Sequence, residues 1–406
     1  MRARVWGRKW MKMKDTLGKV LPLARLKAPL RAKMQEREAA RSLSDYRRRA
    51  RGLGISEPTG EQLAQLLRER VAGRPHPTWP KRMGGIHLFL AYPANDWEDV
   101  LKQGLACFGS VTAFEWRGMG FDDTAPDWLA RRDEMNEAML TAFARANLLN
   151  PVDAVVGYLS GYNTSPRVLV KMAQAGAAIF NFCWDDVLNF PGKVYGGRYT
   201  SVAAIASAVD LNLTNVPANA IKYMVHGGLA LFLPEAAEPT VHRPANVPFK
   251  YDVSFVGACY GWRPKFMRAL SSRGIYVECF GRGWRNGAVT KEEMVELYSR
   301  SRICLGFSTV GHSKRLHCLK GRDFEVPMSG GLYLTGDHED LHRVFRVGEE
   351  VLSYSGVEDC AAKIGWVMDH PDRAATIRRA GRLRSLQDHT YKARWVRAFQ
   401  AAGIVM

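Results

Sequence analysis

The densest group of residues that could do chemistry lies in the last third of the chain. Lys320 and Arg322 stand beside the expected start of a short helix, and Glu325 lies one turn further on. Free amides at a helix start next to cations suit a diphosphate, and a carboxylate nearby suits ribose hydroxyls. Gly330 and Gly331 would then let the backbone approach a ligand before the chain enters a strand. The same residues also fit an ordinary surface helix and turn, so spacing alone leaves both interpretations open.

Two further loops combine glycines with cations. After an apolar run that ends at Gly257, Arg263 and Lys265 open the next amphipathic helix. A strand, a glycine loop and a cationic helix start suit phosphate binding, although neither GxGxxG nor a Walker sequence is present. Gly281 and Arg282 follow the next apolar run and would share the rim of a parallel sheet. The expected ligand-binding residues are therefore Gly257, Arg263, Lys265, Gly281, Arg282, Lys320, Arg322, Glu325, Gly330 and Gly331.

Acidic residues in the first half of the chain offer general-base chemistry. Asp185 and Asp186 follow an apolar run, where a carboxylate could deprotonate an acceptor hydroxyl, but helix capping explains them equally well. Glu235 is expected to cap the next segment at a domain hinge, and His226 to end a helix. The scattered cysteines and histidines lack the paired spacing of a zinc site, so no metal site is predicted.

Alternating strands and helices must position these residues. From residue 86 onward, nearly continuous apolar runs alternate with amphipathic helices, which predicts parallel sheets covered on both faces. The expected strands are 86–93, 111–116, 152–159, 177–184, 210–215 and 229–234, then 251–257, 275–281, 303–308, 331–335 and 350–354. The proline-rich segment 235–250 separates the two series. We therefore expect an α/β protein with two Rossmann-like domains, whose ligands bind in the interdomain cleft.

Length and composition agree with this division. The 406 residues, 47% of them hydrophobic, suffice for two or three cores and exclude global disorder. Thr59 and Gln62 predict a capping box at a helix start.

Seven cysteines without a CxxC pair favour a reducing compartment, and no apolar run is long enough to span a membrane, so we expect a cytoplasmic protein. The expected parts are a basic extension and linker 1–84, a first (acceptor) domain 85–238, a second (donor) domain 239–388, and a crossing helix 389–406.

The basic charge is concentrated at the N-terminus. Residues 1–82 hold 22 Lys and Arg against 7 Asp and Glu, whereas the rest of the chain is nearly balanced. This extension is either a solvated tail or an attachment to an anionic membrane surface through residues 1–34, where aromatic, aliphatic and basic residues are mixed. Pro22 and Pro29 are expected to interrupt any long helix there. Nucleic-acid binding is disfavoured, because a binding fold usually carries its basic stripe on its own body.

Several segments resemble one family of enzymes. The sequence KGRDFEVPMSGGLYLT, which begins at Lys320, resembles the signature of glycosyltransferases related to the spore-maturation protein CgeB. VSFVG followed by Arg263, ELYSRSRICLGFS, and the tail VGEEVLSYSGVEDCAAKIGWVMDHPDRAATIRRAGR are similar to the same family. FNFCWDD and LALFLPEAAEP look like its blocks in the first domain. The resemblance covers about residues 86–400 and leaves residues 1–84 unexplained.

The resemblance implies a GT-B-like fold and transfer, hexosyltransferase-like, from a nucleotide-diphosphate sugar bound mainly to the second domain. By analogy, Glu325 would hold the ribose, and Arg263 with Lys265, Lys320 or Arg322 would neutralise the diphosphate. Enzymes of this fold commonly work without a bound metal, so no cofactor is expected beyond the donor substrate. One departure stands out: retaining relatives often carry a glutamate eight residues before the position of Glu325, where this chain has His317.

Three function classes remain open from the sequence. In the leading hypothesis, Arg263 and Lys320 stabilise charge on the leaving diphosphate, and Asp185 or Asp186 faces an acceptor that is a glycan, a lipid or a protein. Closure about 235–250 would expel water from the cleft. The second hypothesis is a non-catalytic nucleotide-sugar-binding scaffold of the same fold. The third is a nucleic-acid-associated protein that uses its basic arm.

Overall fold

The first domain is built on a six-stranded sheet in which every pairing is parallel. A computed structural model describes residues 21–75, 78–93 and 98–406. The strand order is β2-β1-β3-β4-β7-β8. The strands are β1 (Ile86–Tyr92), β2 (Gly109–Glu115), β3 (Ala154–Gly157), β4 (Ala178–Cys183), β7 (Leu211–Thr214) and β8 (Ala230–Phe232). All seven side chains of β1 are buried, which explains its unbroken apolar run.

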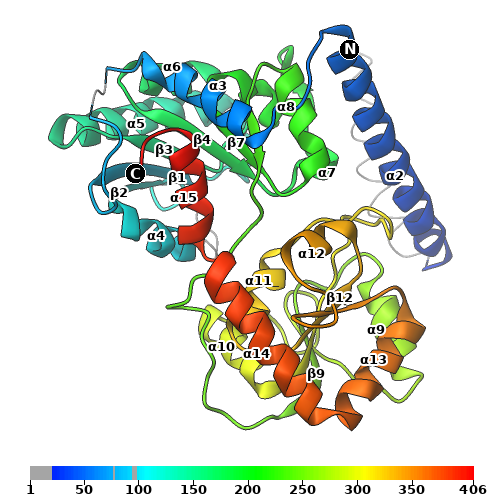
Figure 1. The fold of residues 1–406 in the computed structure, drawn as a ribbon. Helices are drawn as coiled ribbons and strands as arrows, with labels where there is room; N and C mark the ends of the chain where they lie inside the picture. Colours follow the sequence, from blue (N-terminus) through cyan, green and yellow to red (C-terminus); the bar gives the residue numbers. More distant parts are fainter. Residues whose placement is uncertain (1–20, 76–77, 94–97) are drawn as a thin grey trace.

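Helices cover both faces of this sheet (Figure 1). They are α3 (Gly60–Ala72), α4 (Glu98–Leu105), α5 (Trp128–Leu149), α6 (Pro166–Gln174), α7 (Asp186–Asn189) and α8 (Ala220–Val225), with 3-10 turns at Ala106–Phe108, Val202–Ala204, Ala206–Ala208 and Pro217–Asn219. A small antiparallel hairpin joins β5 (Val194–Tyr195) and β6 (Arg198–Tyr199). The predicted capping box of α3 is confirmed: Thr59 accepts from the Gln62 amide, and Gln62 accepts from the Thr59 amide.

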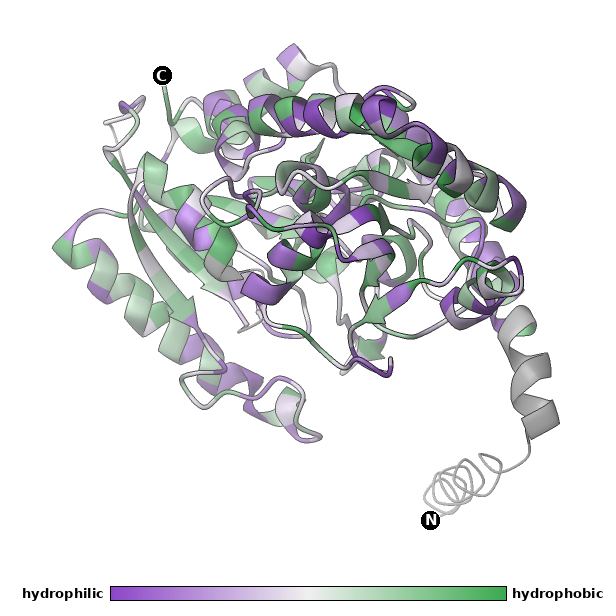
Figure 2. Ribbon diagram, turned by 90° about the horizontal axis from the view of Figure 1, so that it is seen from below, coloured by the Kyte–Doolittle hydropathy of each residue, from purple (hydrophilic) through white to green (hydrophobic). Residues whose placement is uncertain are grey.

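The second domain repeats the pattern with five parallel strands in the order β10-β9-β11-β12-β13. They are β9 (Tyr251–Val256), β10 (Glu278–Phe280), β11 (Ser301–Leu305), β12 (Tyr333–Gly336) and β13 (Leu352–Tyr354). The helices are α9 (Arg263–Ser271), α10 (Lys291–Arg300), α11 (Gly321–Met328), α12 (Glu339–Val344), α13 (Val357–Asp369) and α14 (Pro371–Asp388). Hydrophobic residues concentrate in the strands, whereas the helices carry mixed faces (Figure 2). The predicted α/β architecture with two parallel sheets is confirmed.

The C-terminal helix α15 (Tyr391–Ala401) returns to the first domain, where it appears in red in Figure 1. Phe399 packs edge-on against Phe108 and Phe180, with ring centroids 5.0 and 5.2 Å apart. Beyond the helix, Val405 forms a backbone bridge with Lys81. The chain therefore crosses between the domains twice, once through the proline-rich segment and once between α14 and α15.

A long N-terminal helix, α2 (Leu21–Gly52), runs alongside both domains (Figure 1). The expectation that Pro22 and Pro29 interrupt this helix is wrong. Pro22 falls in the first turn, where amide donors have no helical acceptor in any case, and Pro29 removes only one donor from a helix 32 residues long. Packing against the body then supports the rest of α2. Within the described residues, no helix combines the length and apolarity needed to cross a membrane.

Contacts from α2 reach each domain separately. The buried Tyr46 packs on Phe190 of the first domain and shares a 2.9 Å hydrogen bond with the His226 ring. Nearer the helix start, Gln35 accepts a 2.9 Å hydrogen bond from the His312 amide of the second domain. The neighbouring Glu36 accepts a 2.7 Å bond from the Ser313 hydroxyl. The helix thus ties the two domains together along one side of the molecule.

Candidate active site

The amino end of α11 points into the region between the domains and is fixed by its own third residue. Asp323 accepts a 2.6 Å hydrogen bond from the Lys320 amide and a 2.7 Å bond from the Tyr333 hydroxyl. Burial raises the pKa of Asp323 to about 6. Because this carboxylate satisfies a free amide, the helix begins at Gly321 and holds Lys320 and Arg322 at its start.

Two glutamates from different domains meet at Gly321. Glu325 belongs to α11, and Glu235 follows the last strand of the first domain. Their Oε atoms lie 2.8 and 2.7 Å from the point where a Cβ on Gly321 would stand, so the two oxygens are close neighbours. Burial together with the charge of Glu325 raises the pKa of Glu235 to about 8, and burial raises the pKa of Glu325 to about 7. The junction between the domains therefore holds two carboxyl groups whose pKa values are raised toward neutral pH.

Glu235 is the residue that sequence reasoning missed. Its position after an apolar run suggested only a cap at the hinge. The fold brings it to the start of α11, about 90 positions further along the chain. No local pattern could have revealed this meeting, since it depends on how the two domains face each other.

Lys320 provides a cation near Glu235 and Asp185. Its ammonium group donates a 2.9 Å hydrogen bond to Cys318 Sγ. Burial lowers the pKa of Lys320, but Cys318, Glu235 and Asp185 raise it by more, so the side chain stays charged. Asp185 is exposed and accepts a 3.3 Å hydrogen bond from the Tyr158 hydroxyl. The structure thus brings Asp185 of the first domain toward Lys320 of the second.

Two arginines lie together at the carboxyl end of β9. The Arg263 guanidinium stacks on Tyr260 at 4.1 Å and donates a 2.9 Å hydrogen bond to the Ala258 carbonyl. Arg322 lies 5.6 Å over the ring of Phe255, which Arg263 also covers at 5.3 Å. Burial and the neighbouring Arg322 lower the pKa of Arg263 to about 10.

Neither arginine is neutralised by a direct ion pair. Across the described residues, no carboxylate lies within salt-bridge distance of Arg263 or Arg322. The buried Nε of Arg322 also has no hydrogen-bond partner there. The two guanidiniums repel each other, although the nearby Asp323 and Glu325 offset part of the charge of Arg322. A bound anion would relieve the remaining repulsion and accept hydrogen bonds from both side chains.

The glycines expected around the ligand divide into two groups. Gly257 and Gly281 both have positive φ and pack directly on each other at the ends of β9 and β10, beside Arg322. Gly330 and Gly331 lie at the far end of α11, where a Cβ would meet Pro244 in one case and Val326 in the other. These two glycines make room for the protein's own chain at the end of α11 away from Lys320, so the packing accounts for them, and the approach of a ligand to Gly330 and Gly331 stays a prediction.

The remaining predicted residues also separate. Asp186 is fully buried, and its two oxygens accept hydrogen bonds from Asn219 (2.7 Å) and Tyr223 (2.8 Å). The expectation that Asp186 acts as a base is wrong, because both oxygens fix α8 and none faces the cleft. The side chains of Lys265 and Arg282 are exposed.

His317 stands eight residues before Glu325, where the resemblance to retaining glycosyltransferases leads one to expect a glutamate. Its Nδ1 shares a 2.8 Å hydrogen bond with the Ser308 hydroxyl, and its ring stacks on His338 with centroids 5.6 Å apart. Burial lowers the pKa of His317, so a neutral ring is favoured. The second carboxylate near Glu325 comes from Glu235 of the other domain. Among the described residues, no cluster of three or more His, Cys, Asp or Glu is arranged to hold a metal ion.

Comparison with known proteins supports the architecture. A family model described as glycosyl transferase-like matches residues 263–400. Sucrose-phosphate synthase from Thermosynechococcus elongatus superposes with a TM-score of 0.54 at 12% identity, over 78% of this chain and 98% of that one. A glycosyltransferase from Rickettsia africae superposes with a TM-score of 0.53 at 11% identity, over 79% and 98%. No curated protein matches the sequence. The chain therefore has the two-domain GT-B fold, and the domain that carries the arginine pair matches a glycosyl transferase-like model.

Proposed function

We propose that the protein is a glycosyltransferase, similar to the CgeB-like family, that moves a sugar from a nucleotide-diphosphate donor to an acceptor hydroxyl. The observation that carries the proposal is the pair Arg263 and Arg322, neither of which forms a direct ion pair with a described carboxylate, beside Lys320 at the amino end of α11. Three cations and a helix start match the charge and shape of a diphosphate. All three residues lie within the segment 263–400 that matches the glycosyl transferase-like model.

The proposed reaction follows from these positions. An acceptor oxygen forms a bond to the anomeric carbon of the sugar while the bond from that carbon to the diphosphate breaks. Arg263, Arg322 and Lys320 stabilise the negative charge that grows on the leaving diphosphate, so the protein's cations do what a metal ion does elsewhere. Glu325 binds the ribose hydroxyls, and the exposed Asp185 receives the proton of the acceptor hydroxyl.

Binding of a panel of nucleoside diphosphates, with metal chelated, tests the donor site. We expect Arg322→Gln to weaken diphosphate binding about 10- to 100-fold, because charge-assisted hydrogen bonds contribute about 1.5–3 kcal/mol each. The matched control is Arg268→Gln, which removes the same charge from the exposed face of α9. Equal affinity of Arg322→Gln and Arg268→Gln for nucleoside diphosphates would contradict the assignment of Arg322 to the diphosphate site. Release of the nucleotide from its sugar separates an enzyme from a non-catalytic scaffold, which binds without turnover.

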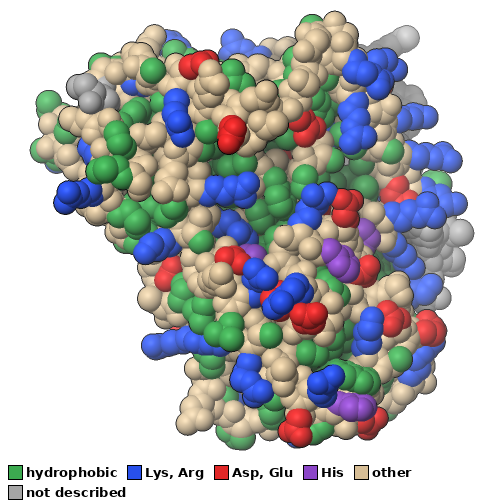
Figure 3. Space-filling view, in the orientation of Figure 1, with side chains coloured by type: hydrophobic (Ala, Val, Ile, Leu, Met, Phe, Trp, Pro, Cys, Tyr) green, Lys and Arg blue, Asp and Glu red, His purple; other side chains and the backbone are tan. Residues whose placement is uncertain are grey.

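We also propose that the protein works in the cytoplasm, with the outward face of α2 on an anionic membrane surface. The exposed cations of this face are Arg31, Lys33, Arg37, Arg41, Arg47, Arg48, Arg49 and Arg51. Only Glu38 and Asp45 are exposed acids there, and Leu30 and Met34 are 62% and 61% exposed. Figure 3 shows Lys and Arg side chains along this edge of the molecule. Basic charge with exposed apolar side chains is typical of helices that lie on a bilayer.

Vesicle flotation tests this surface. The full chain should float with vesicles that contain phosphatidylserine and not with vesicles of phosphatidylcholine alone. Arg37→Glu with Arg41→Glu should abolish flotation, whereas Arg373→Glu with Arg379→Glu, the same charge change on α14, should leave it intact. Equal loss in both double variants would show a response to net charge alone and would remove α2 from the proposal.

A further inference from the structure

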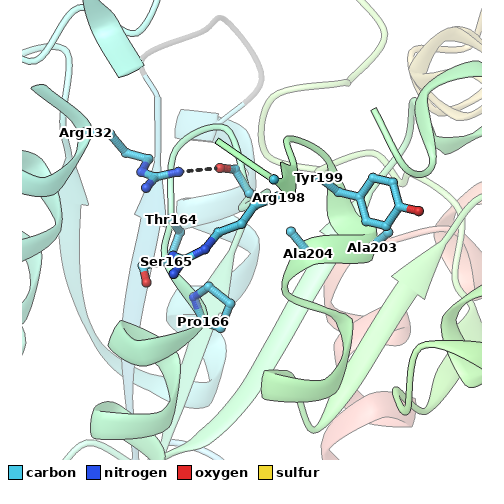
Figure 4. A pocket seen from close by; sticks show the side chains of 10 residues that line it. Arg132, Thr164, Ser165, Pro166, Arg198, Tyr199, Ala203 and Ala204 are labelled. Atoms are coloured by element: carbon cyan, nitrogen blue, oxygen red, sulfur yellow. Dashed lines mark hydrogen bonds between the residues drawn. The ribbon is translucent and has the colours of Figure 1, made fainter. Parts of the chain in front are cut away.

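A pocket lies on the first domain, away from the arginine pair. It has a volume of about 300 Å³ and lies between the start of α5, the loop after β3, the start of α6 and the β5–β6 hairpin (Figure 4). Arg132 and Arg198 line it together with Ser165 and Tyr199, and no acidic residue does. Arg132 also lies 3.4 Å from Asp133, an exposed carboxylate outside the lining, which offsets part of its charge. Arg198 keeps its full charge, so the pocket presents net positive charge to a ligand.

The two arginines reach the pocket from opposite walls. Arg132 donates a 3.0 Å hydrogen bond to the Gly161 carbonyl, drawn as a dashed line in Figure 4, which holds its guanidinium at the rim. Arg198 extends from the hairpin toward Thr164 and Ser165 (Figure 4). Its side chain is exposed and forms no ion pair with any described residue. An uncompensated guanidinium at the positive end of a helix is unfavourable until an anion joins it.

Hydrogen bonds within the protein hold the loop at the floor of the pocket in place without a ligand. Ser165 is the N-cap residue of α6, yet its hydroxyl makes no capping hydrogen bond to that helix. Its amide instead donates a 2.8 Å bond to Asn136, a buried side chain of α5 that also donates 2.9 Å to the Asn163 carbonyl. These buried amide contacts fix the loop, which leaves the Ser165 hydroxyl available at the pocket (Figure 4).

The pocket also shares an element with the cleft. The loop that forms its floor begins at Tyr158, whose hydroxyl bonds to Asp185. Because β3 and β4 are parallel, the segments that follow them leave the sheet at the same edge. A molecule seated in the pocket can thus extend along this edge toward Asp185.

We propose that this pocket binds a phosphate group carried by the acceptor, which places a hydroxyl of that acceptor near Asp185. Two guanidiniums, a serine hydroxyl and a helix start supply donors in the number and geometry that a phosphate monoester accepts. The acceptor role rests on the proposed glycosyltransferase function. The phosphate site itself rests on the pocket alone.

The test uses the full chain and two phosphate probes. Glycerol 1-phosphate represents a soluble source, and vesicles that contain phosphatidic acid represent a lipid source. The vesicles are tested with the Arg37→Glu, Arg41→Glu variant of the full chain, so that α2 does not itself hold the protein on the anionic surface. We expect saturable binding of at least one probe, weakened at least ~10-fold in Arg198→Gln and partly restored in Arg198→Lys. The control is Arg145→Gln, which removes the same charge from an exposed site near the end of α5. Absence of binding to both probes, or equal weakening in Arg145→Gln, overturns the proposal.

A second readout separates the two proposals. Binding of nucleoside diphosphates should be unchanged in Arg198→Gln, since that site lies in the other domain. If the wild type binds the phosphate probe but no nucleoside diphosphate, the proposed glycosyltransferase function is overturned and the proposed phosphate site is kept. If donor turnover with phosphorylated and dephosphorylated acceptors is equal, the acceptor role of the pocket is overturned.

Discussion

Replacement of Glu235 by glutamine should stabilise the protein at alkaline pH and leave it unchanged at acidic pH. The folded state raises the pKa of this carboxyl from 4.5 to about 8, because the group is largely withdrawn from water and lies beside Glu325. Folding therefore favours the protonated form, and ionisation costs stability. This cost is absent below about pH 4.5, grows as the pH rises, and is complete above about pH 8. Glutamine resembles the protonated side chain and never incurs the cost.

The size of the effect follows from the same shift. At about 1.4 kcal/mol for each pKa unit, the full change corresponds to an upper limit of about 5 kcal/mol. Because Glu235 is only partly buried, we reduce this to about 2–3 kcal/mol for screening by water. At about 2–4 °C per kcal/mol for a domain of this size, the melting temperature should rise by about 5–10 °C.

Thermal unfolding of wild type and Glu235→Gln at pH 5 and pH 9 measures this difference. Glu137→Gln is the matched control, since that glutamate is exposed on α5. We expect a gain for Glu235→Gln at pH 9 that shrinks strongly at pH 5, and no pH-dependent gain for Glu137→Gln. The same gain at both pH values, or none at pH 9, would refute the assignment of Glu235 to a shared acidic cleft.

Three further changes test other parts of the structure. Gly321→Ala should keep the helical content, since alanine favours helices, but displace Glu235 and Glu325 and weaken diphosphate binding at least ~10-fold; unchanged affinity in a titration would contradict the packed geometry. Phe399→Ala should destabilise the first domain by about 3–5 kcal/mol and spare the second, so calorimetry should show one shifted transition, and equal shifts would argue against it. Tyr46→Ala should loosen α2 and speed its tryptic cleavage, whereas an unchanged cleavage rate would mean that other contacts hold the helix.

The sequence predicts the sheets well because their strands are buried on both faces. The apolar runs that became β1, β3 and β4 need no tertiary knowledge to be recognised. Cations at helix starts were likewise visible, and Arg263 and Arg322 do lie together. These features are local, and local chemistry determines them.

What the sequence could not predict depends on contacts between distant segments. Asp185 and Asp186 are neighbours in sequence, yet one faces the cleft and the other is enclosed by α8. Gly330 and Gly331 were predicted to lie against a ligand, because the local sequence does not reveal that Pro244 and Val326 pack against them. The length of α2 was underestimated because its stability comes from partners in both domains, not from its own residues.

The return of α15 to the first domain has a consequence for synthesis on the ribosome. The core of that domain contains Leu88 and Phe180 together with Trp395, Phe399 and Ile404, so it is complete only when the chain has been made as far as residue 404. The second domain is continuous in sequence and has all its strands by residue 354. The chain emerges from the ribosome with its N-terminus first. The first domain is therefore translated first but can complete its fold only after α15 has been made, which is later than the second domain. A nascent chain that stops before Tyr391 would carry a folded second domain beside a first domain with an open core.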